Sequence, residues 1–226
     1  STPYWTIDYE SIRMLPMSSL PVNRRLDPDA RRRQLLEAGF QLIQTRPFSQ
    51  VTADEVARAV GVSKGLVFHY FPTNRDLQVA IVRVAAGELL SRLNVDPDLA
   101  PEQRLGAGLE AFVGFIETQP ANYLAVARSV GSDPALLEVF EETRAAVVEL
   151  ILAAIGLAEN PPPGLRIVVR GWIAMVEESV LHWLEGSPVP RDQLLAFLQR
   201  AAASMLPDAL LTFSPPEPAA GAEATA

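Results

Sequence analysis

Residues 61–71, "GVSKGLVFHYF", gather side chains that could contact a charged or aromatic partner. His69 and Tyr70 carry polar groups on rings, and Lys64 carries a positive charge. Donors of these kinds bind phosphate oxygens and the edges of bases. Two apolar side chains in the same stretch could contact thymine methyl groups, namely Leu66 and Phe68. These residue types favour contact with nucleic acid.

A short helix must display these side chains, and the sequence predicts one. Ser63 is a typical residue at a helix N-cap. A preceding helix is expected to start at Thr52, with Glu55 three residues later in the capping-box pattern. It is expected to end at Gly61, where a left-handed cap is needed. Helix, tight turn and helix form the arrangement that enters the major groove of DNA.

Helical spacing divides this segment into a buried and an exposed face. Val67 and Phe71 are four residues apart and continue the apolar face of Val56 and Val60, so we expect both to be buried. For the other rings, packing against the first helix is the alternative to contact with DNA, and Phe68 lies at the border of the two faces. The residues expected to contact DNA are Thr52, Ser63, Lys64, Gly65, Leu66, Phe68, His69, Tyr70, Asn74 and Arg75.

The whole chain reads as all-α, because strand-like alternation is absent and helix-forming residues dominate. Residues 24–80 are expected to form a three-helix head, and residues 81–208 a larger helical body. Residues 1–23 read as an extension and residues 209–226 as a disordered tail. The expected helices are 27–45, 52–60, 63–71, 75–93 with Asn74 as cap, 101–118, 121–131, 134–156, 163–186 and 191–206.

Charge is distributed unevenly along the 226 residues, whose net charge is −8. Residues 24–80 hold nine basic against six acidic residues, a net charge of +3, whereas the part after residue 80 carries −10. This asymmetry suggests a basic head on an acidic body. The chain has no cysteine, and its two histidines lie far apart, so we expect no cofactor and no metal. With no secretion signal and no membrane span expected, we predict a cytoplasmic protein.

Residues 31–80 resemble the N-terminal domain of TetR/AcrR-family transcriptional repressors, from "LLEAGFQLI" through "VTADEVARAVGVSKGLVFHYF" to "NRDL". The resemblance implies a homodimer that binds a palindromic operator and is released by a small molecule. Two departures from the family pattern matter. Asn74 stands where a lysine usually contacts a phosphate, so that role passes only weakly to Asn74 or Arg75. Phe68 replaces a tyrosine and loses its hydroxyl.

The acidic body is expected to dimerise and to bind the effector. The resemblance places the dimer interface on the last two helices, with a stripe of apolar residues that could otherwise be an internal core face: Leu194, Leu195, Phe197, Leu198, Ala201 and Met205. The apolar excess favours a hydrophobic ligand. Its candidate contacts, most of which could instead be core, are Phe112, Phe115, Ile116, Tyr123, Val126, Phe140, Trp172, Met175, Val176, Glu178 and His182.

Two other classes of function compete with a DNA-binding regulator. An enzyme would need a nucleophile–base pair, a phosphate-binding loop or a metal set, and we find none of these patterns in the sequence. A helical protein-interaction module without sequence-specific DNA binding is the main alternative. Salt-dependent, sequence-selective binding to DNA would exclude that alternative.

Overall fold

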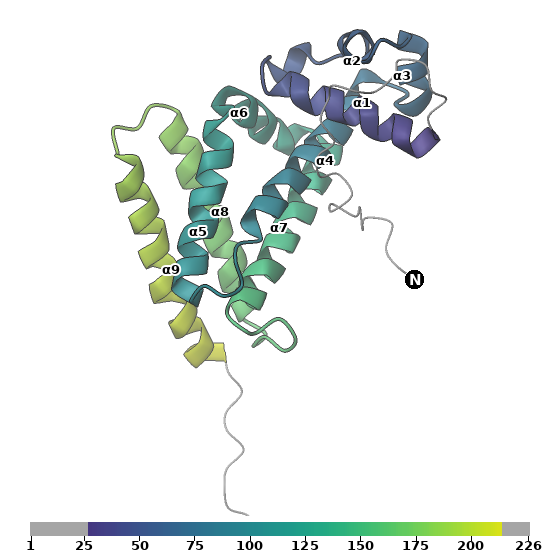
Figure 1. The fold of residues 1–226 in the computed structure, drawn as a ribbon. Coiled ribbons are helices and arrows are strands. Elements are labelled where there is room, and N and C mark those ends of the chain that lie inside the picture. The colour runs from purple at the N-terminus through teal and green to yellow at the C-terminus, as the bar shows by residue number, and fades with distance from the viewer. Residues whose placement is uncertain (1–26, 214–226) are drawn as a thin grey trace, which may run out of the picture. The chain divides into compact units, whose positions relative to one another are not determined.

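The computed structural model describes residues 27–213, and all regular structure within them is helical (Figure 1). The predicted all-α class is confirmed. The expected extension at residues 1–23 lies outside the described residues. The elements in chain order are α1 (Pro28–Ile43), the 3-10 turn η2 (Phe48–Gln50), α2 (Ala53–Val60), α3 (Lys64–Tyr70), α4 (Asn74–Leu93), α5 (Pro101–Glu117), α6 (Pro120–Ser129), the 3-10 turn η3 (Val130–Ser132), α7 (Pro134–Ala154), α8 (Leu165–Leu184) and α9 (Arg191–Phe213).

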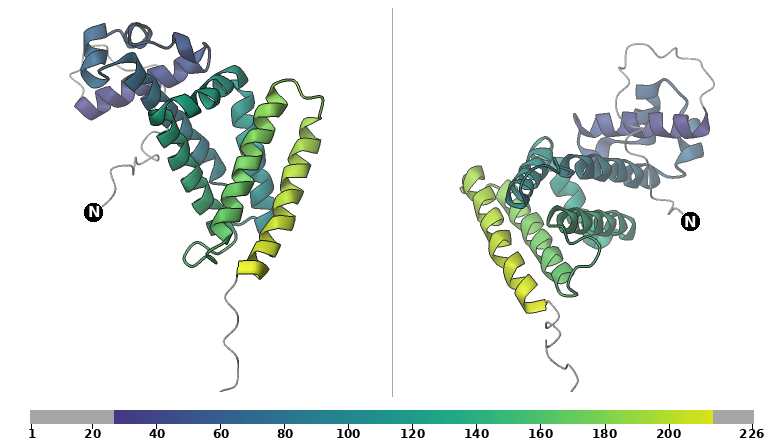
Figure 2. Two further views of the ribbon diagram at one scale, coloured as in Figure 1. Left: turned by 180° about the vertical axis from the view of Figure 1, so that it is seen from behind. Right: turned by 60° about the horizontal axis from the view of Figure 1, so that its bottom comes forward.

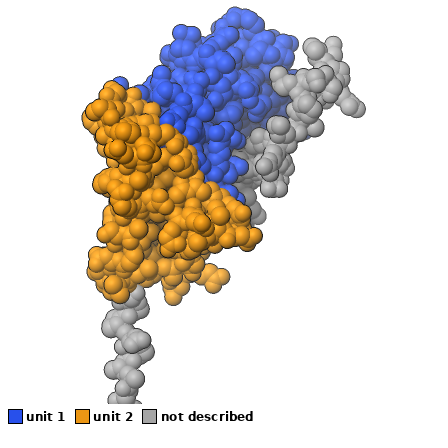
Figure 3. Space-filling view, turned by 60° about the vertical axis from the view of Figure 1, so that its left-hand side comes forward, with its two compact units in different colours: residues 1–94, 111–143 blue, residues 95–110, 144–226 orange. Residues whose placement is uncertain are grey.

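These helices divide into two compact units (Figure 3). Unit 1 comprises residues 1–94 and 111–143, and unit 2 comprises residues 95–110 and 144–226. The division does not follow the expected boundary at residue 80, because α6 and the first turns of α7 share a core with the helix-turn-helix. The first boundary between the units follows α4, after residue 94, and the other two fall within α5 and α7.

The core of unit 1 joins the buried face of the helix-turn-helix to its supporting helices. Val56, Val67 and Phe71 are buried as predicted, together with Leu77 and Ile81 of α4. Three residues from α6 and α7 complete the same cluster: Val126, Leu136 and Val139. Helices α1 and α4 approach closely at Gly39, where an added Cβ atom would overlap the Ile81 side chain. Gly39 therefore has a packing role, because any side chain there would displace Ile81.

The predicted helix ends are confirmed in α2 and α3. The Thr52 and Ser63 side chains accept hydrogen bonds from backbone amides three residues later, as N-caps do. Gly61 ends α2 with φ of 75°, the left-handed conformation that glycine adopts without strain. The full capping box is found in α4 instead, where Thr73 and Asp76 bond to each other's backbone amides. The expectation that Asn74 caps α4 was therefore wrong by one residue.

In unit 2, α8 and α9 run side by side in the views of Figure 2. The indole of Trp172 donates a buried hydrogen bond of 3.1 Å to the carbonyl of Leu198. Helix α9 continues past its expected end, through Pro207, because Ala209 is buried and the ring of Phe213 lies against Gly164. Among the described helices, only α9 is long and apolar enough to cross a membrane, a test that a core helix of a soluble protein also passes.

Candidate nucleic-acid interface

Helix α3 presents a continuous exposed surface of mixed chemistry. Lys64, Gly65 and His69 are exposed, whereas Leu66, Phe68 and Tyr70 are half-buried. Phe68 and Tyr70 also pack against the core of unit 1. Contact with DNA and packing within the protein were alternative expectations for these rings. Both are possible for Phe68 and Tyr70, because each ring packs on the core while part of it remains accessible.

Neighbouring rings and cations order this surface. The rings of His69 and Tyr70 meet edge to face, with centroids 5.3 Å apart. The ammonium of Lys64 lies 5.8 Å from the centre of the Phe68 ring. From α1, the guanidinium of Arg32 covers the Phe71 ring at 5.2 Å. Cation–π contacts of this kind hold long flexible side chains near aromatic faces.

The N-terminus of α2 lies next to this surface in sequence and offers a second kind of contact. The Thr52 hydroxyl oxygen accepts from the Glu55 amide at 3.4 Å, so its own hydrogen can still be donated. The Ala53 amide donates to the Asn74 carbonyl oxygen at 2.8 Å. Helix N-termini favour anions, because their amides point outward and the helix dipole is positive there. The Thr52 hydroxyl, which retains a hydrogen to donate, is thus placed at the positive end of the α2 dipole.

The structure gives Asn74 and Arg75 structural partners. The Asn74 side chain accepts from the Ala53 amide at the start of α2. Arg75 forms an ion pair with Asp133, the residue before α7. The pKa of the Asp133 carboxyl lies below its ordinary value, first because the Leu136 amide donates to it and then because Arg75 pairs with it. Both side chains that could replace the phosphate-binding lysine of related sequences thus already have bonds within unit 1.

The arginines around α2 are also paired. Arg46 and Arg58 both contact the Glu55 carboxylate, and Arg58 reaches Asp54 at 2.7 Å as well. The hydrogen bond from Arg58 is the main cause that lowers the pKa of Glu55. Glu55 therefore does not complete the capping box that its position suggested.

The expected effector contacts divide between the two units. Six lie in unit 1, where the rings of Phe112 and Tyr123 meet edge to face at 6.3 Å and Arg92 covers the Phe115 ring at 5.3 Å. Ile116 and Val126 are buried, and Phe140 is half-buried. The other five lie on α8 in unit 2. Of these, Trp172 and Val176 are buried, Met175 is half-buried, and Glu178 and His182 lie on the exposed face.

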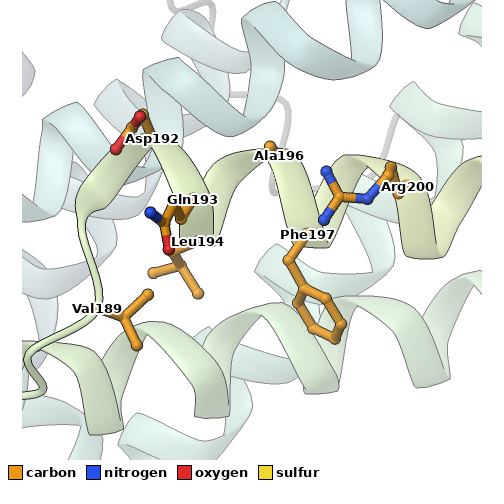
Figure 4. A pocket seen from close by; sticks show the side chains of 7 residues that line it. All are labelled: Val189, Asp192, Gln193, Leu194, Ala196, Phe197 and Arg200. Carbon is orange, nitrogen blue, oxygen red and sulfur yellow. The ribbon is translucent and has the colours of Figure 1, made fainter.

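The expected dimer stripe is also divided, by burial. Leu194, Leu195 and Leu198 are buried within unit 2, and Ala201 is half-buried. Phe197 and Met205 remain exposed, at 52% and 36% of their surface. Phe197 lines an open hollow of about 580 Å³ on α9 and the preceding loop (Figure 4). The other residues that line it are Val189, Asp192, Gln193, Leu194, Ala196 and Arg200.

Sequence reasoning missed the polar side chains that tie α6 to the helix-turn-helix. Asn122 forms hydrogen bonds with three backbone groups between α1 and α2, and Gln119 forms a fourth. The partners lie more than seventy residues apart in sequence. The sequence carries no local signal for such a contact, because caps and helix periodicity report only on neighbouring residues.

Comparison with known proteins agrees with the helix-turn-helix geometry. Residues 35–81 match the family described as bacterial regulatory proteins of the tetR family, and residues 101–205 match a tetracyclin repressor-like C-terminal domain. The fold and the exposed face of α3 define a helix-turn-helix transcriptional regulator. The chain belongs to the TetR family of these regulators.

Three relatives illustrate the similarity. The HTH-type transcriptional activator FasR of Mycolicibacterium smegmatis is 30% identical over 74% of this chain and 79% of its own length. The HTH-type transcriptional regulator BetI of Escherichia coli is 36% identical over 41% of this chain and 48% of its own. A tetR-family regulator from Streptomyces coelicolor has a similar crystal structure, with a TM-score of 0.70, 28% identity, and coverage of 83% of this chain and 85% of that one.

Proposed function

We propose that this protein is a ligand-responsive transcriptional regulator that binds a palindromic operator as a homodimer and is released by a hydrophobic small molecule. The exposed face of α3, with Lys64, His69 and the accessible part of Tyr70, is the observation that carries the proposal. In a dimer, two such helices would lie about one turn of DNA apart, ~34–36 Å. Thr52 would anchor the backbone while the α3 side chains meet base edges.

The proposed dimer contact uses the part of α9 that unit 2 leaves uncovered. Phe197 and Met205 are exposed apolar side chains on this helix, and Leu211 is 84% exposed further along. Exposed apolar side chains grouped on one helix are typical of an interface. The three buried leucines Leu194, Leu195 and Leu198 would support this surface from within unit 2 without touching the partner.

The proposed effector contacts are the half-buried rings of unit 1, in particular Phe112 and Tyr123, which already touch each other. Rings that are neither fully buried nor free can rearrange around a bound apolar molecule. A panel of lipophilic compounds should include one that raises the midpoint of thermal unfolding, because a ligand that binds only the native state stabilises it. If no compound in a broad panel changes the midpoint, the proposed class of effector is wrong.

Selection of bound duplexes from a random DNA pool, at two salt concentrations, tests the proposed function directly. We expect enrichment of a palindrome and a steep loss of affinity with salt, because phosphate contacts release counterions. A folded protein that enriches no sequence would instead support the alternative of a protein-interaction module. The family resemblance favours repression, whereas FasR is named an activator, and transcription from a promoter that carries the selected sequence distinguishes the two.

A further inference from the structure

The connection between α1 and α2 is held by side chains from α6, within unit 1. The amide nitrogen of Asn122 donates to the carbonyl of Ile43 at 2.7 Å and to that of Arg46 at 2.8 Å. Its carbonyl oxygen accepts from the amide of Phe48 at 2.8 Å. One side chain thus bonds to the last residue of α1, to the turn after it, and to the first residue of η2.

These bonds use both amide hydrogens and the amide oxygen of Asn122, and they satisfy backbone groups that the helices leave open. The last carbonyls of a helix have no partner within the helix. Asn122 takes that of Ile43, and Gln119 donates to that of Gln44, the C-cap residue. A side-chain amide can donate two hydrogen bonds from its nitrogen while its oxygen accepts another. Asn122 therefore fixes the direction in which the chain leaves α1.

The same connection determines where the phosphate-binding end of α2 lies. Phe48, whose amide binds Asn122, is buried in the core of unit 1, and Val51 beyond it is fully buried. The side chain of Gln78, on α4, donates to the Val51 carbonyl at 3.2 Å. Thr52 follows directly. Contacts from α6 and α4 thus hold the chain up to the residue that is expected to meet the phosphate.

We propose that Asn122 is a positioning residue for DNA binding, which acts by setting the place of Thr52 and the N-terminus of α2. The inference rests on the proposed contact between this end of α2 and a phosphate. Asn122 does not itself need to touch DNA. Its three bonds go to protein backbone, and removing them frees the segment between Ile43 and Thr52 to take other conformations.

A double-mutant cycle tests this role. The variants are Asn122→Ala, Thr52→Val and the pair, with Asn94→Ala as the control, because Asn94 is the C-cap of α4 in the same unit. The probe is the duplex that the wild-type protein selects from a random pool, and affinity is measured at a temperature where every variant is fully folded. We expect Asn122→Ala and Thr52→Val each to weaken binding by about tenfold, as for loss of one hydrogen bond to a charged group. In the Asn122→Ala background, Thr52→Val should add less than about twofold.

Asn122→Asp separates the bonds. Its carboxylate can accept from Phe48 but cannot donate to the two carbonyls, so binding should weaken at least as much as with alanine. Hydrogen exchange in residues 44–52 should accelerate in both Asn122 variants and stay unchanged in Asn94→Ala.

Three outcomes overturn the inference. Additive effects of Asn122→Ala and Thr52→Val on affinity would mean that Asn122 influences binding by a route other than the position of Thr52. Wild-type affinity in a folded Asn122→Ala protein would mean that its bonds do not position α2. Failure of the wild-type protein to select any duplex would reject the proposed DNA-binding function together with this inference, and is distinct from selective binding that the variants leave intact.

Discussion

The Asn74 side chain accepts a hydrogen bond of 2.8 Å from the Ala53 amide and so joins the start of α4 to the start of α2. Ala53 is the first residue of an eight-residue helix, where an amide has no partner within the helix. Asn74→Ala should reduce the free energy of unfolding by about 1 kcal/mol, the usual effect of losing a cap. Urea denaturation measures the free energy of unfolding, with Asn94→Ala as the control. If Asn94→Ala loses as much stability as Asn74→Ala, the bond to Ala53 contributes nothing specific.

The polar ends of the α3 rings should carry sequence selectivity. Replacing Tyr70 or His69 with alanine should reduce the preference for the selected duplex over an unrelated one by about tenfold, the range of a good base contact. Tyr70→Phe keeps the ring that packs on the core and removes only the hydroxyl. Competition binding with both duplexes gives the ratio. If the ratio is unchanged in folded His69→Ala and Tyr70→Ala proteins, other residues recognise the bases.

Thr52 should act on all DNA sequences alike. Thr52→Val removes both the hydroxyl and the cap that it gives α2, at nearly constant shape. In the folded variant, affinity for selected and unrelated duplexes should fall by a similar factor. The salt slope should change little, because the hydroxyl carries no charge. Thr52→Ser retains the hydroxyl and should bind as the wild type does. A loss confined to the selected duplex would identify Thr52 as a base contact instead.

The ion pair of Arg75 with Asp133 predicts a pH dependence of stability. The folded pKa of Asp133 is depressed below its ordinary value, so its contribution is present above the unfolded pKa, near 4, and is lost as the pH falls through the folded value. Asp133→Asn should therefore lower stability at neutral pH. On acidification, the variant should lose less stability than the wild-type protein does. Unfolding midpoints between pH 3 and pH 7 provide the test, and parallel curves for the two proteins would contradict it.

The exposed ring of Phe197 should be required for dimerisation. Phe197→Glu would bury two charges in an α9-mediated interface, and we expect the dimer to dissociate at concentrations where the wild type is intact. Because Phe197 is 52% exposed in unit 2, the fold should survive. Glu102→Gln, exposed in the first turn of α5 and outside the last two helices, is a comparison in the same unit that adds no charge. Sedimentation velocity distinguishes the species, and a dimeric Phe197→Glu protein would reject this interface.

Local signals in the sequence were sufficient to predict the helix-turn-helix of unit 1. The caps at Thr52 and Ser63, the left-handed glycine at Gly61, and the burial of Val67 and Phe71 all follow from spacing and residue type. The helix-turn-helix assignment followed from the same signals, and the family resemblance, which the comparisons confirm, added the class of regulator.

Contacts between distant segments could not be predicted in the same way. The capping-box pattern gives only the spacing of Thr52 and Glu55. It does not show that the Glu55 carboxylate pairs with Arg46 and Arg58 and leaves the Thr52 amide. Pro207 would normally end a helix, yet packing of Phe213 on Gly164 continues α9 beyond it. The bonds of Asn122 depend on a segment that folds next to α6 only in three dimensions.

The chain passes between its two units three times, after residues 94, 110 and 143. A single exchange of sequence between two related regulators would therefore not transfer one unit intact. A fragment that ends with α4 would lack Val126, Leu136 and Val139 and would leave the apolar surface that they cover open to solvent. A chimaera that keeps the core of the helix-turn-helix complete must also include α6 and the first turns of α7.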